Sequence, residues 1–251
     1  MLYTIMFSPT GGTSKAARKL SLAWEKDKKE IDLFHKGFER RLPELCEDDV
    51  CIVAAPVYSG RIPSIAADRI AMLKGNGARA VVMAVYGNCK LGDAMVEMED
   101  ILSSCGFNIT AGIEAVAEHS LIREFASGRP DTTDAENLLK FGKEIQEKIA
   151  AGNTERPRFP GNRPYKERKE GLHPFVLSGC IDCSICAREC PANAISWSGN
   201  WVADPKKCIS CMHCIRFCPK SYRILPEDKL KAIKERLEPI ASVRKEDKLY
   251  I

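Results

Sequence analysis

The sequence predicts an α/β protein with a doubly wound parallel sheet, followed by a small α+β module rich in cysteine. Residues 1–151 alternate apolar runs of strand length with helix-like segments. The runs are continuously apolar, as in parallel strands that are covered by helices on both faces. Eight of the twelve cysteines lie between residues 180 and 218, which sets this stretch apart. A chain of 251 residues is long enough for one domain of ordinary size and a small second one.

Five strands are expected in the first domain, over residues 2–7, 30–33, 50–56, 79–86 and 108–117. Four helices are expected between and after them, over residues 13–25, 64–74, 91–105 and 134–151. Gly106 ends the third helix, and Thr132, Thr133 or Asp134 is expected to cap the fourth.

The chain changes character after residue 151. Residues 152–174 interleave prolines with arginines and lysines, which predicts an extended linker. Its basic charge is either simply solvated or lies against an acidic surface of a neighbouring domain. Residues 175–225 contain the cysteine module. Residues 226–251 predict a C-terminal helix and tail, because apolar side chains recur there at helical spacing, at Leu230, Ile233, Leu237 and Ile240.

Composition excludes some classes of function. The net charge of +4 and the pI near 8.4 are too mild for a nucleic-acid-binding domain, whose pI usually exceeds ~9. No apolar run reaches the ~18 residues of a membrane helix. The N-terminus enters a strand-like run with no basic segment before it, which argues against a signal peptide and predicts a cytoplasmic protein. In such a protein, clustered cysteines predict metal ligands rather than disulfides.

The cysteine module contains one motif twice. C-x2-C-x2-C-x3-C-P occurs at Cys180, Cys183, Cys186 and Cys190, and again 28 residues later at Cys208, Cys211, Cys214 and Cys218. Three cysteines spaced in this way can wrap one face of a cubane, and the fourth reaches the other cluster. The motif therefore predicts two [4Fe–4S] clusters. One is expected on Cys180, Cys183, Cys186 and Cys218, and the other on Cys208, Cys211, Cys214 and Cys190.

Zinc is the alternative, but zinc sites use paired C-x2-C units that are separated by a longer gap. The complete motif resembles the two-cluster bacterial ferredoxins, and this resemblance implies clusters close enough for rapid electron exchange. His213 stands between two of the ligands. Because eight cysteines already supply the ligands, we expect it to be a surface or hydrogen-bonding residue.

A loop rich in glycine and hydroxyl groups follows the first strand, and its candidate binding residues are Ser8, Thr10, Gly11, Gly12 and Thr13. Between a strand and a helix, such a loop turns N–H groups and hydroxyls toward an anion. It has no lysine or arginine, so a monophosphate suits it better than a triphosphate. A merely capped, glycine-rich turn is the alternative.

Two further loops follow the third and fourth strands. In a sheet of order 2-1-3-4-5, the ligand crevice lies at the carboxyl ends of strands 1 and 3. The candidate binding residues there are polar, small or aromatic, and Tyr58 and Tyr86 could flank a planar ring. They are Pro56, Val57, Tyr58, Ser59 and Gly60 in one loop and Tyr86, Gly87, Asn88 and Asp93 in the other.

The first domain resembles the flavodoxin-like superfamily, because Ser8, Thr10, Gly11 and Thr13 match its phosphate-loop pattern [ST]-x-T-G-x-T. The resemblance implies the sheet order 2-1-3-4-5 and bound FMN, with the phosphate on residues 8–13 and the ring between residues 56–60 and 86–93. Leu91 stands near the place of a second stacking aromatic in flavodoxins, so Tyr58 is expected to stack alone.

The whole architecture resembles the EFR1-type ferrodoxin family of anaerobes, in which a flavodoxin-like FMN domain is fused to a 2[4Fe–4S] ferredoxin domain. Glu118–Ser120 and Gly128–Asp131 also look like that group. We expect His119 to be structural and Cys89 to be a neutral lining residue.

The leading interpretation is an electron-transfer flavo-iron–sulfur protein that couples one-electron and two-electron carriers. Its partner would be a redox protein or a small redox acceptor, without nucleic acid or membrane insertion, and its oligomeric state is open. The alternative is an FMN-dependent reductase of a quinone, a nitro compound or a similar acceptor, fed by the clusters, with Tyr58, Arg61 or His119 contacting the substrate. A redox sensor is a third interpretation.

Overall fold

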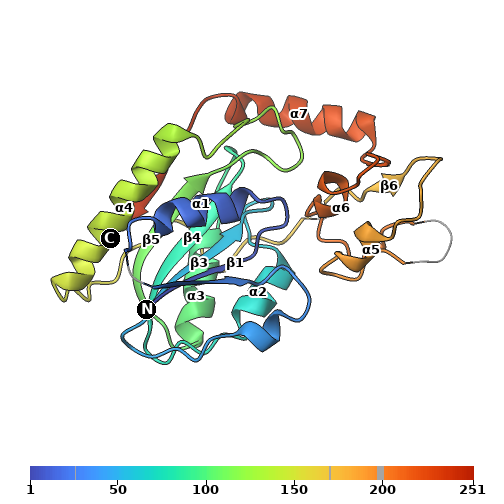
Figure 1. Cartoon of the computed structure of the whole chain (residues 1–251). Helices are drawn as coiled ribbons and strands as arrows, with labels where there is room; N and C mark the ends of the chain where they lie inside the picture. The colour runs from blue at the N-terminus through green and yellow to red at the C-terminus, as the bar shows by residue number, and fades with distance from the viewer. Residues whose placement is uncertain (26, 170, 197–200) are drawn as a thin grey trace.

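The computed structural model describes residues 1–25, 27–169, 171–196 and 201–251. Its central sheet has the order β2-β1-β3-β4-β5-β8, and the first five strands are mutually parallel (Figure 1). These are β1 Leu2–Met6, β2 Lys28–Asp32, β3 Val50–Pro56, β4 Arg79–Tyr86 and β5 Asn108–Val116. The order 2-1-3-4-5 is that of the doubly wound flavodoxin-like fold, which confirms the predicted fold class.

Helices cover both faces of the sheet, as the continuously apolar strands predict. The first four helices are α1 Gly12–Ser21, α2 Ser64–Ile70, α3 Ala94–Ser104 and α4 Thr132–Ala150, and a short 3₁₀ helix, η1, spans Phe38–Arg41. One core contains Leu20 of α1 and Leu138 of α4, packed with Ile52 of β3. The opposite core contains α2 and α3, packed with the alternate residues of the same strands.

The prediction of five strands misses the sixth. β8, Lys248–Tyr250, pairs antiparallel with β5 at the edge of the sheet, and Ile113 is opposite Leu249. A three-residue strand has too few alternating positions to stand out in a sequence, and it forms here only because β5 offers a free edge.

The cap of α4 also differs from the prediction. Asp131, not one of the three residues that follow it, is the N-cap. Its carboxylate accepts the Asp134 N–H at 3.1 Å, and the Asp134 carboxylate accepts the Asp131 N–H at 2.8 Å. This reciprocal pair is a capping box in which aspartate takes the place of glutamate.

Residues 156–168 lie along the acidic face of α3, so the basic charge of this stretch is not simply solvated. We call residues 155–168 the strap. Arg156 donates to Glu99 at 2.9 Å, and Arg163 donates to Glu99 and Asp100 at 2.8 and 2.6 Å. The chain between the two domains is thus bound to the first of them over much of its length.

The cysteine module contains two short helices, α5 Ile185–Arg188 and α6 His213–Arg216. A two-stranded ribbon pairs β6, Phe175–Val176, with β7, Arg223–Ile224. The predicted C-terminal helix is α7, Glu227–Ala241, which runs from the module back across the first domain (Figure 1). Leu230, Ile233 and Leu237 pack there beside Ile122 and Phe125 of the loop after β5.

Candidate metal centre and the neighbouring loops

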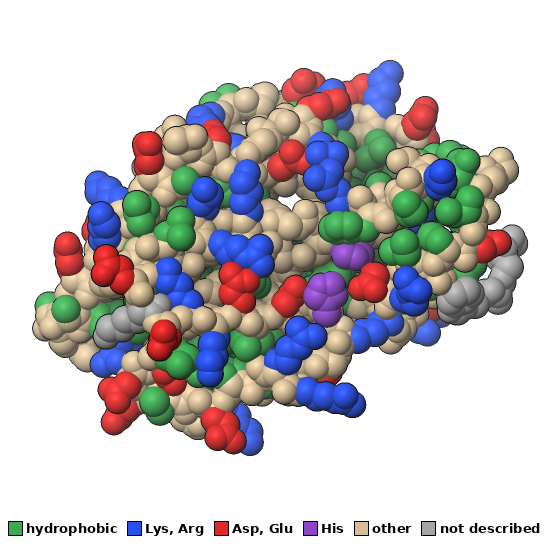
Figure 2. Space-filling view, viewed as in Figure 1, with side chains coloured by type: hydrophobic (Ala, Val, Ile, Leu, Met, Phe, Trp, Pro, Cys, Tyr) green, Lys and Arg blue, Asp and Glu red, His purple; other side chains and the backbone are tan. Residues whose placement is uncertain are grey.

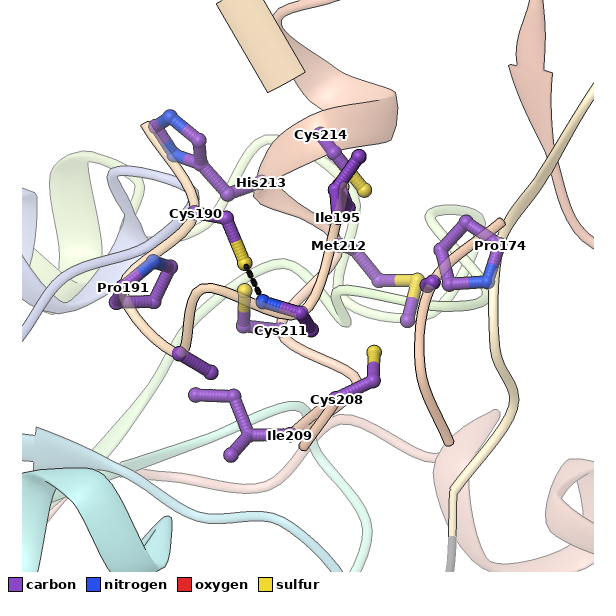
Figure 3. Close-up of a pocket in the computed structure, with 13 residues that line it drawn as sticks. Pro174, Cys190, Pro191, Ile195, Cys208, Ile209, Cys211, Met212, His213 and Cys214 are labelled. Atoms are coloured by element: carbon purple, nitrogen blue, oxygen red, sulfur yellow. Dashed lines mark hydrogen bonds between the residues drawn. The ribbon is translucent and has the colours of Figure 1, made fainter. Parts of the chain in front are cut away.

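Two cavities in the module are each lined by four cysteines. Cys190, Cys208, Cys211 and Cys214 surround one cavity, and we call them the inner quartet (Figure 3). Cys180, Cys183, Cys186 and Cys218 line a second cavity, and we call them the outer quartet. The structure therefore brings together the same two sets that the crossed motif predicts.

The duplicated motif folds as a duplicated backbone. Ser184 and Met212, which precede α5 and α6 and are 28 residues apart, have φ values of 61° and 62°. Two more pairs with the same separation have positive φ, Asp182 with Ser210 and Asn193 with Ser221. Each half thus presents its three closely spaced cysteines in the same way, and its fourth cysteine reaches the other half.

The thiols of the inner quartet lie in an apolar setting. Burial raises the pKa of Cys208 and Cys211, and it raises the pKa of Cys214 to about 11. In the outer quartet, burial alone would raise the pKa of Cys218, but the backbone N–H groups of residues 220–223 outweigh it, and the pKa is lowered. Iron binds the thiolate, so loading the inner quartet must release protons.

Within the described residues, no three His, Cys, Asp or Glu side chains stand close enough together to share a single metal ion. A cubane binds its thiolates on separate irons, and it therefore needs a wider ring of sulfurs than one ion does.

The inner quartet lies against the carboxyl ends of β1 and β3. Cys211 belongs to the same apolar core as the residues of α2 and α3, and Tyr58 packs against that core. Burial raises the pKa of Tyr58 well above its usual value, and the Cys211 thiolate adds to this effect. Arg69 of α2 donates to the carbonyl oxygen of Pro191, next to Cys190, at 3.2 Å. These contacts place one quartet beside the loops that follow the strands.

His213 links the module directly to the glycine-rich loop. Its Nδ1 lies 2.6 Å from the carbonyl oxygen of Pro9, and the ring is buried against Phe34. A carbonyl oxygen only accepts, so Nδ1 carries the proton. The hydrogen-bonding role expected of His213 fits this geometry, whereas a surface position does not.

The glycine-rich loop has unused donors. The Ser8 Oγ accepts the Ser14 N–H at 2.9 Å, and Gly11, at φ 92°, precedes α1. In the described part of the chain, the N–H groups of residues 10–13 have no protein acceptor. This is the arrangement of a helix N-terminus that can take an anion.

The loops after β3 and β4 touch each other at their bases. Asp93 N–H donates to the Gly60 carbonyl at 2.8 Å, and a Cβ on Gly92 would lie 2.5 Å from that oxygen. Tyr58 and Arg61 close the β3 loop through a pair of backbone hydrogen bonds, while Pro56 ends β3 itself. The predicted ring-binding loops are therefore neighbours, as the sheet order requires.

Two residues predicted to line the ring serve another purpose. The Asn88 side chain donates to the carbonyl oxygens of Ala241 and Val243 at 2.7 and 2.8 Å, which fixes the end of α7. The Asp93 carboxylate accepts the N–H groups of Asn162 and Lys166 at 2.9 Å each, which fixes the strap. Both side chains tie distant segments to the loops. Tyr86, at the end of β4, is buried in the core.

His119 has a structural environment. Its Nδ1 accepts the N–H groups of Leu121 and Ile122 at 3.2 and 3.0 Å, and burial lowers its pKa to about 4. The neighbouring Glu118 binds Arg123 at 2.5 Å and the Gly128 N–H at 3.3 Å. The two segments around residues 118–120 and 128–131 thus hold one loop in shape. Cys89 is half-buried, and burial raises the pKa of its thiol.

Arg223 is a buried residue that no sequence motif singles out. It is 1% exposed and lines the cavity of the outer quartet. An isolated arginine after the last cysteine looks like a surface residue, because its neighbours Lys220 and Tyr222 are of ordinary polar types.

Comparison with known proteins agrees with the two parts. Residues 179–222 match the family model of the 4Fe-4S dicluster domain. A ferredoxin-like protein in the nif region of Sinorhizobium fredii is 49% identical over 35 residues, which are 14% of this chain and 55% of that protein. The chain thus spans about half the length of this curated relative.

Solved structures similar to this chain include two flavodoxins. One is from the domain Archaea (TM-score 0.40, 11% identity, 59% of this chain and 98% of that chain). The other is flavodoxin 1 of Bacillus cereus (TM-score 0.40, 18% identity), and the match covers 58% of this chain and 97% of that chain. A rubredoxin:oxygen oxidoreductase of Desulfovibrio gigas has a TM-score of 0.44 at 17% identity, over 60% of this chain and 36% of that chain.

The sheet order and the cysteine module define the class: a flavodoxin-like domain fused to a ferredoxin-type 4Fe–4S module. The family match of residues 179–222 indicates an iron–sulfur module, and the sheet order shows the fold of the first domain. No described helix has both the length and the apolar character needed to cross a membrane. On the face drawn in Figure 2, basic and acidic side chains are interspersed.

Proposed function

We propose that this chain is an electron-transfer protein that holds two [4Fe–4S] clusters and one FMN. The outer and inner quartets would each bind one cluster. The FMN phosphate would lie on residues 8–13, and its ring would lie between the loops after β3 and β4. When bound, FMN exchanges electrons in pairs or singly and each cluster exchanges one, so together they would couple the two kinds of carrier.

The position of the inner quartet is the observation that carries this proposal. Cys211 packs into the core that Tyr58 touches, and the adjacent His213 bonds to Pro9 of the glycine-rich loop. The module thus contacts the glycine-rich loop and packs beside the loop after β3, which are two of the loops of the proposed flavin site. Tyr58 would lie between the ring and the inner quartet, where it excludes water from the gap.

The glycine-rich loop fits a phosphate monoester. The free N–H groups of residues 10–13 supply donors, and α1 adds the positive end of its dipole. Lys15, the nearest lysine, donates instead to the Gly128 carbonyl oxygen at 3.0 Å. Dipoles would therefore hold the phosphate without a partner cation from the loop.

The alternative, reduction of a small acceptor over the flavin, would use Tyr58, Arg61 or His119 to contact the substrate. Arg61 is already bound to Glu97 at 2.7 Å and to the Lys166 carbonyl oxygen at 2.7 Å. The Nδ1 of His119 already accepts two backbone N–H groups. Neither Arg61 nor His119 favours this alternative over electron transfer.

The test begins with anaerobic purification of the full chain and measurement of iron, sulfide and flavin per chain. We expect eight irons, eight sulfides and one FMN, followed by resolved redox steps in the visible and EPR spectra. Four irons or fewer after reconstitution would contradict the proposed pair of clusters. No flavin after reconstitution would contradict the FMN site.

A matched pair of variants tests the phosphate loop. Thr10→Asp adds a negative charge beside the free N–H groups, and we expect at least tenfold weaker FMN binding, or about 1.4 kcal/mol. Thr10→Asn has nearly the same size and no charge, so it serves as the control. Iron content should be the same in both. Equal FMN affinity in the two variants would place the phosphate elsewhere.

A further inference from the structure

Arg223 carries a buried positive charge, and no carboxylate among the described residues pairs with it. Its Nη1 donates to the Trp201 carbonyl oxygen at 2.8 Å, and its Nη2 donates to that of Pro174 at 3.3 Å. The Nε has no hydrogen-bond acceptor among the described residues. Because arginine stays charged at any physiological pH, burial without a counter-charge is costly.

The Arg223 guanidinium contacts a sulfur of the outer quartet. The Arg223 Nη1 lies 3.8 Å from the Cys186 Sγ of the outer quartet. Burial raises the pKa of Cys186, Cys208 and Cys214, and the charge of Arg223 partly offsets that rise in all three. Arg223 also lines the cavity of the outer quartet, so its guanidinium lies beside that set of cysteines.

The duplication gives an internal comparison. The residue 28 positions before Arg223 is Ile195, which lines the cavity of the inner quartet. Ile195 is buried in the module core and has no charge. The same position in the two halves thus holds an apolar side chain beside one quartet and a cation beside the other, so burial alone does not require the arginine.

We infer that Arg223 is a buried counter-charge for the outer cluster, which raises the affinity of that cluster for an electron. This inference rests on the proposed function, in which each quartet holds a cluster. One electron from an external reductant or from the flavin adds one negative charge to a cluster. Arg223 keeps its proton in that step and stabilises the added charge, because net charge and hydrogen bonds to sulfur set cluster potentials.

Four variants of the full chain, purified anaerobically and reconstituted, test the inference. Arg223→Gln and Arg223→Met remove the charge, and Arg223→Lys retains it. Arg188→Gln is the control, because Arg188 is an exposed arginine two residues from Cys186. The readouts are iron and sulfide per chain and the two cluster midpoint potentials, from EPR-monitored titration.

In the loaded neutral variants, we expect the outer cluster to bind its electron at least tenfold more weakly, which corresponds to about 59 mV for a one-electron couple. The other midpoint should fall by less, and Arg223→Lys should stay near the wild type. Neutral variants that load both clusters and shift no more than the Arg188→Gln control would overturn the inference. So would a Lys variant that shifts as far as they do.

Loading itself decides the case if the neutral variants fail to bind clusters. If Arg223→Lys then loads normally, a cation at this position is required, which supports the inference. If Arg223→Lys also fails to bind clusters, then cluster loading requires the shape of the arginine side chain rather than its charge, and the inference is wrong. A wild-type chain without iron would instead refute the proposed function, and the inference with it.

Discussion

The Nδ1 of His213 donates to the carbonyl oxygen of Pro9 across 204 positions of the sequence, at 2.6 Å. This hydrogen bond joins the loop after β1 to the helix that carries Cys214. It is buried between the two domains, so no water can replace the donor when the imidazole is removed.

The first prediction concerns this contact. We expect His213→Ala to destabilise the chain by about 1–3 kcal/mol, because the Pro9 carbonyl oxygen loses its buried donor. His213→Asn retains a donor near Nδ1 and should recover part of the loss. Denaturant unfolding of both variants measures the difference. Equal stability of Ala, Asn and wild type would show that the contact contributes nothing.

The second prediction separates the two quartets. Cys218→Ser should free Cys180, Cys183 and Cys186 for alkylation in the reconstituted protein, while Cys208, Cys211 and Cys214 stay protected. Cys190→Ser should give the opposite pattern, because these cysteines cross between the halves. Mass spectrometry after alkylation reads the outcome. Loss of the cluster nearest in sequence, in either variant, would contradict the crossing.

The third prediction concerns Glu97, which is 2% exposed and holds the strap to the first domain. Its carboxylate binds Arg61 at 2.7 Å and also pairs with Arg168. Glu97→Gln leaves the buried Arg61 without its counter-charge, and we expect a loss of about 3–5 kcal/mol. Urea unfolding measures the loss, and faster proteolysis within residues 155–168 should accompany it.

A surface ion pair provides the control for Glu97. Glu144 lies 3.8 Å from Lys140 on the exposed side of α4. Glu144→Gln should change stability by less than about 0.5 kcal/mol, because such pairs contribute little. Similar losses for the two variants would mean that Glu97 acts only as an ordinary surface charge.

The fourth prediction is a pH dependence. Burial raises the pKa of Asp247 to about 6, although its Oδ1 accepts the Val116 N–H at 2.8 Å. The folded chain therefore binds this proton more tightly than the unfolded chain does. The contribution is fully present below the unfolded value near 3.9 and is lost as the pH rises through 6, by up to about 3 kcal/mol.

Asp247→Asn tests that sign. The variant cannot ionise at this position, so its stability relative to wild type should increase between pH 4 and pH 7. Thermal unfolding at several pH values within that window gives the comparison. A stability difference that stays constant across the window would refute the raised pKa.

The sequence predicts those features of the structure that are determined within a short stretch of the chain, and it does not predict those that depend on contacts between distant segments. The bounds of β3 and β4 are confirmed because each is a continuous apolar run. The crossing of Cys190 and Cys218 follows from spacing within one short module. β8 was missed because its pairing depends on an edge of β5 that lies more than a hundred residues earlier.

The candidate flavin residues show the same limit. Asn88 and Asp93 have the polar character of ligand-binding loops, but their partners come from segments distant in the sequence, such as Lys245, 157 positions from Asn88. Arg223 was missed because nothing in the sequence distinguishes a buried arginine from an exposed one. Contacts between distant segments determine the roles of these three residues, and such contacts cannot be predicted from the residue types alone.

The pairing of β8 with β5 makes the cysteine module an insertion within the sheet-forming chain. The strap anchors the chain that enters the module, and the segment after α7 anchors the chain that leaves it. A carrier domain on one flexible tether must search for its docking position before each transfer, at an effective concentration set by the tether. A module fixed at both its entry and its exit avoids that search, so the rate of transfer within the chain would be set by distance and driving force rather than by domain motion.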